Sequence, residues 1–170
     1  YGSPDVLEFK EVIKPIPKNH EVFVKIHAAS VNALDWHFMR AVPFLARLEN
    51  GLVSPKETRL GSDLAGTVEA VGSRVTQFQP GDAVIGNTFG RGLGTFAEYV
   101  CVSEDLLVFK PARISFEAAA AVPTAALTVL QGRLFQAERY RGELSVTSIA
   151  VKVFDANGMT QAEKNVEQTL

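Results

Sequence analysis

The stretch from Gly61 to Gly86 constrains the fold more than any other part of the chain. Glycines at positions 61, 66, 72, 81 and 86 separate short runs rich in valine, threonine and isoleucine. Such runs favour β-strands, and glycine or proline between them favours tight turns. Pro80-Gly81 supplies one turn, because proline presets the backbone angle and glycine accepts a positive φ. The stretch has no helical period, and it predicts several short strands of an antiparallel barrel.

Three other regions also favour strands. From Glu21 to Ala29 the chain alternates, so that the even-numbered residues from Val22 to Ala28 share one face of a strand. Residues 96–102 and 106–109 are further strand candidates.

Short helices are expected after these strands. Ser115 is a suitable N-cap for a helix over residues 116–121. Pro123 would break that helix, because proline lacks the backbone donor that a helix interior needs. A second helix is therefore expected from near Thr124 to Leu130.

The composition excludes several classes of function. The chain has 170 residues, of which 46% are hydrophobic, enough for one domain with a proper core. A formal net charge of -2 and scattered basic residues argue against nucleic-acid or anionic-membrane partners. No apolar run approaches the ~20 residues that span a bilayer. The single cysteine, Cys101, excludes an internal disulfide and fits a reducing, cytoplasmic setting.

Four motifs occur in an order that identifies a family. They are A-A-S-V-N-A-L-D at 28–35, G-S-D-L-A-G-T-V-E-A-V-G at 61–72, G-T-F-A-E-Y-V at 94–100 and A-V-P-T-A-A-L-T at 121–128. Over residues 1–131 the chain resembles the quinone oxidoreductase branch of the medium-chain dehydrogenase/reductase superfamily. The resemblance implies a fold that is mainly β with short helices (α+β), a GroES-like twisted β-barrel.

Residues 132–170 lie outside this resemblance and are expected to form an atypical tail. Residues 145–154 alternate like an added strand, and residues 160–163 have the capping-box spacing of a short C-terminal helix. No G-x-G-x-x-G motif follows Gln131, and the tail is too short for a dinucleotide-binding domain.

The resemblance implies an oxidoreductase. Members of this family reduce quinones, enones or other small carbonyl compounds with NADPH. This chain resembles the substrate-side domain of such a reductase or of a zinc-free alcohol dehydrogenase. Without a cofactor-binding domain, we expect it to be incomplete as an enzyme and inactive alone. The alternative is a non-catalytic GroES-like binding or structural module that docks on a protein partner or forms a homo-oligomer. The substrate, and the choice between NADPH and NADH, stay open.

Two residues are candidates for cofactor binding by this resemblance, and each has a structural alternative. Asn32 would contact the nicotinamide ribose of NADPH, or it could bond its own backbone as a loop asparagine. Thr128 would face the nicotinamide end of the cleft, or its hydroxyl could bond an upstream helix carbonyl. No residue is assigned a catalytic role.

Four further residues are candidates for the substrate pocket: Asp35, Trp36, Phe44 and Asp63. Asp35 could instead orient the Asn32 loop or cap the helix that follows it. Trp36 and Phe44 could instead close the core, as apolar residues near loops commonly do.

The sequence argues against zinc. Zinc-dependent members of the superfamily hold a catalytic zinc with two cysteines and one histidine. The corresponding positions here carry Asn32, Ser62 and Thr124, which supply neither thiolate nor imidazole. His37 lies near the same loop, but a lone histidine near an aspartate is more commonly a hydrogen-bonding pair. We therefore expect no metal site.

Overall fold

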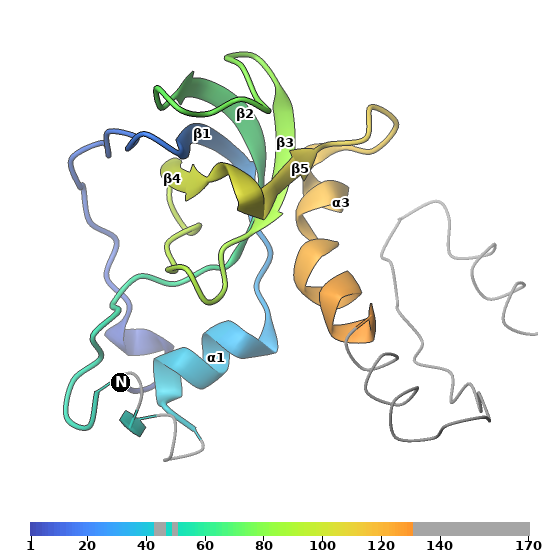
Figure 1. Cartoon of the computed structure of the whole chain (residues 1–170). Helices are drawn as coiled ribbons and strands as arrows, with labels where there is room; N and C mark the ends of the chain where they lie inside the picture. The colour runs from blue at the N-terminus through green and yellow to red at the C-terminus, as the bar shows by residue number, and fades with distance from the viewer. Residues whose placement is uncertain (43–46, 49–50, 131–170) are drawn as a thin grey trace, which may run out of the picture.

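A computed structural model describes residues 1–42, 47–48 and 51–130. Phe44 and the expected tail domain 132–170, with its strand and short helix, lie outside these residues. The described part is mainly β-structure with short helices, which confirms the fold class predicted from the sequence (Figure 1).

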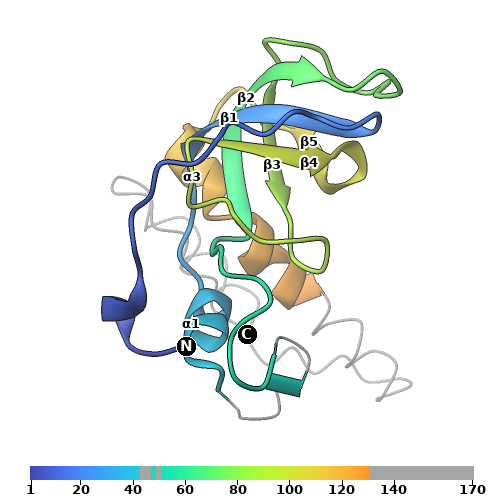
Figure 2. The same cartoon turned by 90° about the vertical axis from the view of Figure 1, so that its left-hand side faces the viewer.

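One antiparallel sheet organises the domain. Its strands are β1 (Glu21–Ala28), β2 (Asp63–Val71), β3 (Ala83–Asn87), β4 (Tyr99–Ser103) and β5 (Leu107–Phe109). They lie in the order β4-β1-β2-β3-β5, so the first strand pairs with both the second and the fourth. The short 3-10 helix η2 (Glu104–Leu106) joins the two edge strands, and the sheet curls between them (Figures 1 and 2).

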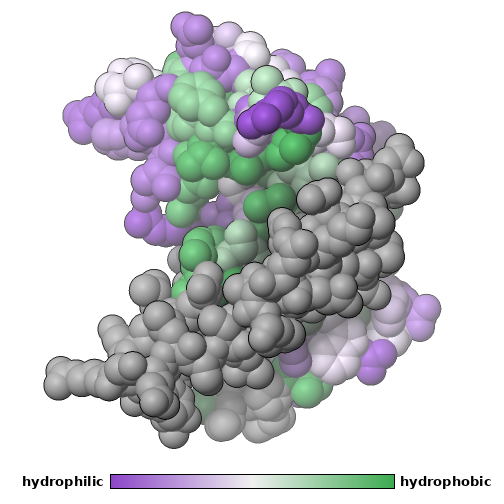
Figure 3. Space-filling model, turned by 90° about the vertical axis from the view of Figure 1, so that its right-hand side faces the viewer, coloured by the Kyte–Doolittle hydropathy of each residue, from purple (hydrophilic) through white to green (hydrophobic). Residues whose placement is uncertain are grey.

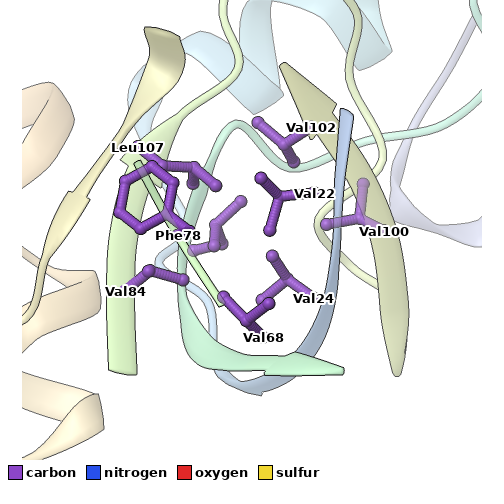
Figure 4. Close-up of a cluster of buried hydrophobic side chains, with 9 residues drawn as sticks. Val22, Val24, Val68, Phe78, Val84, Val100, Val102 and Leu107 are labelled. Carbon is purple, nitrogen blue, oxygen red and sulfur yellow. The ribbon is translucent and has the colours of Figure 1, made fainter. Parts of the chain in front are cut away.

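The inner face of the curled sheet holds a valine-rich core (Figure 4). Its buried residues are Val22, Val24, Leu64, Val68, Phe78, Val84, Val100, Val102 and Leu107. The alternation predicted for β1 is confirmed, because Val22 and Val24 both point into this core. Phe23 lies on the other face, where its ring stacks on that of Tyr99 with centroids 5.3 Å apart.

The helices lie below and beside the sheet in Figure 1. They are η1 (Pro4–Val6), α1 (Ala33–Arg40), α3 (Phe116–Ala120) and a helix over residues 123–130. Among the described residues, none of the helices combines the length and the apolar character needed to cross a membrane.

The expected breaks between the last helices are confirmed. The hydroxyl of Ser115 accepts a hydrogen bond from the Ala118 N–H at 3.2 Å and so caps α3. Pro123 opens the helix 123–130, one residue earlier than we expected. Proline fits the first helical position, since an N–H there would have no partner within the helix.

β4 begins later than the sequence pattern predicts. We expected a strand from Phe96, but the first paired residue is Tyr99. The Phe96 N–H instead donates to the carbonyl of Leu60 at 3.2 Å, which ties the loop before β4 to the segment before β2. Leu106, expected to open the next strand, belongs to η2. Alternation of residue types does not reveal such competing backbone partners.

Gly66 lies on β2 against the backbone of β1, and this leads to a stability prediction. A Cβ atom at Gly66 would stand 2.2 Å from the carbonyl oxygen of Lys25 and 2.8 Å from Cγ1 of Val24. We expect Gly66→Ala to lower the free energy of unfolding by about 3 kcal/mol, because two paired strands must separate. Urea denaturation followed by circular dichroism measures the change.

Gly81→Ala is the matched control. Nothing lies within 4 Å of a Cβ there, and only the φ of +98° is strained. The expected loss at Gly81 is about 1 kcal/mol. A larger loss at Gly81 than at Gly66 would contradict the close approach of the strands.

Candidate functional site

Asp63, the first residue of β2, lies at the end of the sheet from which α1 and the helix 123–130 extend (Figures 1 and 2). It pairs in register with Asn87, the last residue of β3. The loop between β1 and α1 reaches the same end with Ser30 and Asn32, and the helix 123–130 brings Thr124. Segments far apart in the sequence therefore meet at one carboxylate.

The Asp63 carboxylate accepts five hydrogen bonds. The donors are the Ser30 hydroxyl at 2.8 Å, the Asn32 amide at 3.1 Å, the Asn87 amide at 2.7 Å, and the Thr124 N–H and hydroxyl at 3.1 and 2.8 Å. Asp63 is 0% exposed, and a buried carboxylate needs such donors to offset its lost hydration. Asp63 therefore positions its neighbours, and it exposes no surface of its own in the described part of the chain. Its place in the substrate pocket stays a prediction.

Two members of this cluster were missed from the sequence. Asn87 could have been found by placing the strand that ends at residue 87 opposite Asp63. Ser30 stands two residues before Asn32, and nothing in its sequence context separates it from an ordinary loop serine.

The Asn32 side chain is half-buried and held by its neighbours. Its amide nitrogen donates to the hydroxyl of Ser30 at 3.0 Å as well as to Asp63. These bonds fix the orientation of the side chain at the sheet end. The contact of Asn32 with a nicotinamide ribose stays a prediction.

Asp35 ties the same loop to the start of β2. It is the third residue of α1, and Asn32 is the N-cap. One carboxylate oxygen accepts from the Asn32 N–H at 2.8 Å, and the other accepts from the Gly61 N–H at 3.0 Å. Asp35 thus orients the loop and caps the helix at once. Asp35 is buried, which favours this structural alternative, and its place in the substrate pocket stays a prediction.

Thr128 is exposed on the helix 123–130. Its hydroxyl donates to the carbonyl of Thr124 at 2.8 Å, which is the bond that the structural alternative anticipates. A hydroxyl that donates one bond keeps acceptor capacity on its oxygen. The geometry is therefore compatible with both roles, and cofactor binding by Thr128 stays a prediction.

Trp36 is the one described aromatic residue among the four pocket candidates. Its side chain lies on α1 and is 44% exposed, with the Arg40 guanidinium 5.5 Å from the ring centroid. On the same helix, the ring of Phe38 meets that of Phe89 edge-on, with centroids 6.2 Å apart. This contact joins α1 to the loop after β3. Trp36 is accessible to an apolar ligand, and its pocket role stays a prediction.

The donor set at this end of the sheet consists of amides and hydroxyls. Across residues 1–42, 47–48 and 51–130, no cluster of three or more His, Cys, Asp or Glu side chains could hold a metal ion. Ser62 is fully buried, and its hydroxyl lacks a hydrogen-bond partner among the described residues. Together with Asn32 and Thr124 it offers no ligand that a tetrahedral zinc ion prefers. Zinc independence stays a prediction that this donor set supports.

The single cysteine is not an activated nucleophile. Cys101 lies on β4, and β1 separates that strand from β2. Burial of the thiol, with a further contribution from the negative charge of Glu21, raises the pKa of Cys101 to about 11. The thiol therefore stays protonated at neutral pH.

Comparisons with known proteins agree on one family. Residues 18–112 match the model of the alcohol dehydrogenase GroES-like domain. The chain is 38% identical to a chloroplastic quinone-oxidoreductase homolog of Spinacia oleracea over 132 residues, which cover 76% of this chain and 38% of the relative. It is 38% identical to a quinone oxidoreductase of Pseudomonas aeruginosa over 143 residues, which cover 84% of this chain and 40% of the relative.

Solved structures give the same result. The quinone oxidoreductase from Coxiella burnetii superposes with a TM-score of 0.69 at 38% identity, covering 81% of this chain and 43% of that one. The Escherichia coli quinone oxidoreductase complexed with NADPH gives a TM-score of 0.61 at 30% identity, covering 76% and 36%. The chain thus spans about two fifths of the length of the relatives it matches.

The buried carboxylate leads to a second prediction. We expect Asp63→Asn to lower the free energy of unfolding by about 3 kcal/mol, because an amide NH2 would face groups that now donate to a carboxylate. Glu69→Gln makes the same chemical change at an exposed site on the same strand. It should stay within about 0.5 kcal/mol of the unsubstituted chain. Equal stability of the two variants in urea denaturation would contradict the role given to Asp63.

The raised pKa of Cys101 predicts slow alkylation. At pH 8 a thiol with a pKa of about 11 has roughly 100-fold less thiolate than one with the ordinary value of 9.0. The rate of reaction with iodoacetamide in the folded chain should therefore keep rising up to about pH 11. The urea-unfolded chain is the control. A rate that levels off near pH 9 in the folded chain would show that the thiol is not shielded.

Proposed function

The chain belongs to the alcohol dehydrogenase GroES-like domain family, and from this we propose that it is the substrate-side domain of a zinc-independent, NADPH-dependent reductase. Its substrates would be quinones, enones or other small carbonyl compounds. Quinone oxidoreductases are prominent among the relatives. A cytoplasmic setting is part of the same proposal.

One observation carries the proposal. The buried Asp63 carboxylate holds Asn32 and Thr124 together, although the two residues come from opposite ends of the domain sequence. These hydrogen bonds fix the orientation of the Asn32 and Thr124 side chains, so that a ligand can contact polar groups here without reorganising them.

The residues present fit the nicotinamide end of NADPH. Asn32 offers an oriented amide and Thr128 an exposed hydroxyl with acceptor capacity, and both suit sugar or carboxamide groups. When bound, the cofactor supplies the hydride. The chain's own residues would orient the cofactor and the substrate. Trp36 and Phe44 are proposed as apolar walls of the substrate pocket. Without a Lewis acid, polarisation of the substrate carbonyl falls to hydrogen bonds.

A second candidate is a non-catalytic module that docks on a protein partner. It is favoured by exposed apolar residues at the last described helix. Val122 precedes this helix, and Leu127 and Leu130 lie on it, at 37%, 45% and 56% exposure. Figure 3 shows apolar surface on the side of the molecule that carries α3. A domain that binds the cofactor would fit this surface, and so would a partner without chemistry.

A chimaera separates the two candidates. Residues 1–130 of this chain would replace the matching region of the Escherichia coli quinone oxidoreductase, which has been solved with NADPH. We expect the chimaera to oxidise NADPH with 1,4-benzoquinone or an enone as acceptor. In it, Asn32→Ala should lower kcat/KM at least about tenfold, because an oriented cofactor contact is lost.

Ser73→Ala is the matched control, since Ser73 follows the opposite end of β2, where its hydroxyl donates to the Asn19 side chain at 3.1 Å. It should leave kcat/KM unchanged. A folded chimaera that binds NADPH yet turns over no quinone, enone or aldehyde would reject the reductase proposal and favour the docking module.

A further inference from the structure

Asn87, the last residue of β3, uses both polar atoms of its side chain to hold other segments. Its amide nitrogen donates to the Asp63 carboxylate at 2.7 Å and to the Thr124 hydroxyl at 2.9 Å. Its amide oxygen accepts from the Phe89 N–H at 2.9 Å. One side chain therefore joins the end of β3 to β2, to the helix 123–130 and to the loop after β3.

The partners fix which way round the amide of Asn87 lies. A carboxylate accepts hydrogen bonds and cannot donate them, so the NH2 group must face Asp63. The backbone N–H of Phe89 can only donate, so the amide oxygen must lie on that side. Both hydrogens of the NH2 group are committed, one to Asp63 and one to Thr124. Asn87 therefore has no donor left for a ligand and acts on a ligand through the groups that it holds.

The first of these groups is the start of the helix 123–130. The Thr124 hydroxyl accepts from Asn87 and donates to Asp63 at 2.8 Å. The Thr124 N–H donates to the same carboxylate at 3.1 Å. One turn further along, the Thr128 hydroxyl donates to the Thr124 carbonyl at 2.8 Å. Asn87 therefore fixes the direction of the Thr124 hydroxyl, and with it the turn of helix that carries Thr128.

The second group that Asn87 holds is the loop after β3. The hydrogen bond from the Phe89 N–H fixes the start of this loop. The ring of Phe89 meets the ring of Phe38 on α1 edge-on, with 6.2 Å between the centroids. The same helix carries Trp36, the candidate wall of the substrate pocket. The loop therefore connects Asn87 to the helix that would face the substrate.

We propose that Asn87 is a positioning residue that joins the two halves of the proposed site. Through Thr124 it positions the helix that carries Thr128, the candidate cofactor contact. Through Phe89 it positions α1, which carries Trp36, the candidate substrate contact. The inference rests on the proposed reductase function, because both candidate contacts come from it.

Three substitutions separate the two connections. The carboxylate of Asn87→Asp can still accept from the Phe89 N–H. It can no longer donate to Thr124, and it faces the carboxylate of Asp63. Leucine has a similar size to asparagine and makes none of these hydrogen bonds, so Asn87→Leu breaks both connections. Phe89→Ala leaves the hydrogen bonds of Asn87 in place and removes only the ring contact with Phe38.

The stability of the chain as it exists tests where the amide lies. Two facing carboxylates share one proton, which raises the apparent pKa of that proton. A folded chain with such a raised pKa is most stable at low pH and loses stability as the pH rises. In urea denaturation, the unfolding equilibrium constant of Asn87→Asp should therefore rise from pH 5 to pH 8 at least about tenfold more than that of the unsubstituted chain.

Asn19→Asp is the matched control for this measurement. It makes the same chemical change at an exposed residue, where the Ser73 hydroxyl can donate to a carboxylate as it does to the amide oxygen. Its pH dependence should follow that of the unsubstituted chain. Equal changes in the Asn87→Asp and Asn19→Asp variants would overturn the placement of the amide against a carboxylate.

The chimaera with the Escherichia coli quinone oxidoreductase tests the positioning role. In titration calorimetry, Asn87→Asp should raise the Kd for NADPH about tenfold, and it should leave the KM for 1,4-benzoquinone within about twofold. Phe89→Ala should raise the KM for the quinone and leave the Kd for NADPH unchanged. Asn87→Leu should raise both constants. A merely structural role would not divide the two constants between the two substitutions.

Failure of this inference is distinguishable from failure of the proposed function. An unsubstituted chimaera without NADPH binding, or without turnover, would reject the proposed function, and this inference would fall with it. An active chimaera whose variants at positions 87 and 89 change both constants equally, or change neither, would overturn the positioning role of Asn87 alone.

Discussion

The buried carboxylate of Asp63 is the constraint on which the arrangement of the surrounding loops depends. A charge without solvent exposure is tolerated only when nearby donors replace its hydration, and here four side chains and one backbone amide do so. The β2–β3 register fixes Asp63 and Asn87 on a rigid base. The β1–α1 loop and the helix 123–130 must then be in place at the same time. If either moves away, the Asp63 carboxylate loses hydrogen-bond donors that nothing else replaces.

At this end of the sheet, buried groups hold the structure in place, and accessible groups are free to contact a ligand. Asp35 and Asp63 are closed off from solvent and hold backbone and side chains in place. Asn32, Trp36 and Thr128 stand further out and can meet a ligand. A rigid sheet with accessible polar and aromatic groups on the loop and helices at one end is an arrangement that suits a functional site.

Much of the fold was predictable, because β-branched alternation and glycine or proline turns are local signals. They identified β1, the cap at Ser115 and the helix break at Pro123. The strand expected over residues 96–102 is present as β4, but its expected start at Phe96 was wrong, since the Phe96 N–H donates to the distant Leu60 carbonyl. The same limit applies to the site. Motif resemblance pointed to Asp63, but only the strand register shows that it is buried and serves its neighbours.

The strand order also governs how the chain can fold. β2 and β3 are near neighbours in sequence, pairing Thr67 with Ala83, whereas β1 and β4 pair Lys25 with Tyr99. Closing the larger loop costs more chain entropy before any contact stabilises it, and such non-local pairing slows folding. Val100 and Val102 complete the core only at that step. During synthesis, the inner face of β1 therefore cannot be covered in full until residues up to Ser103 have left the ribosome.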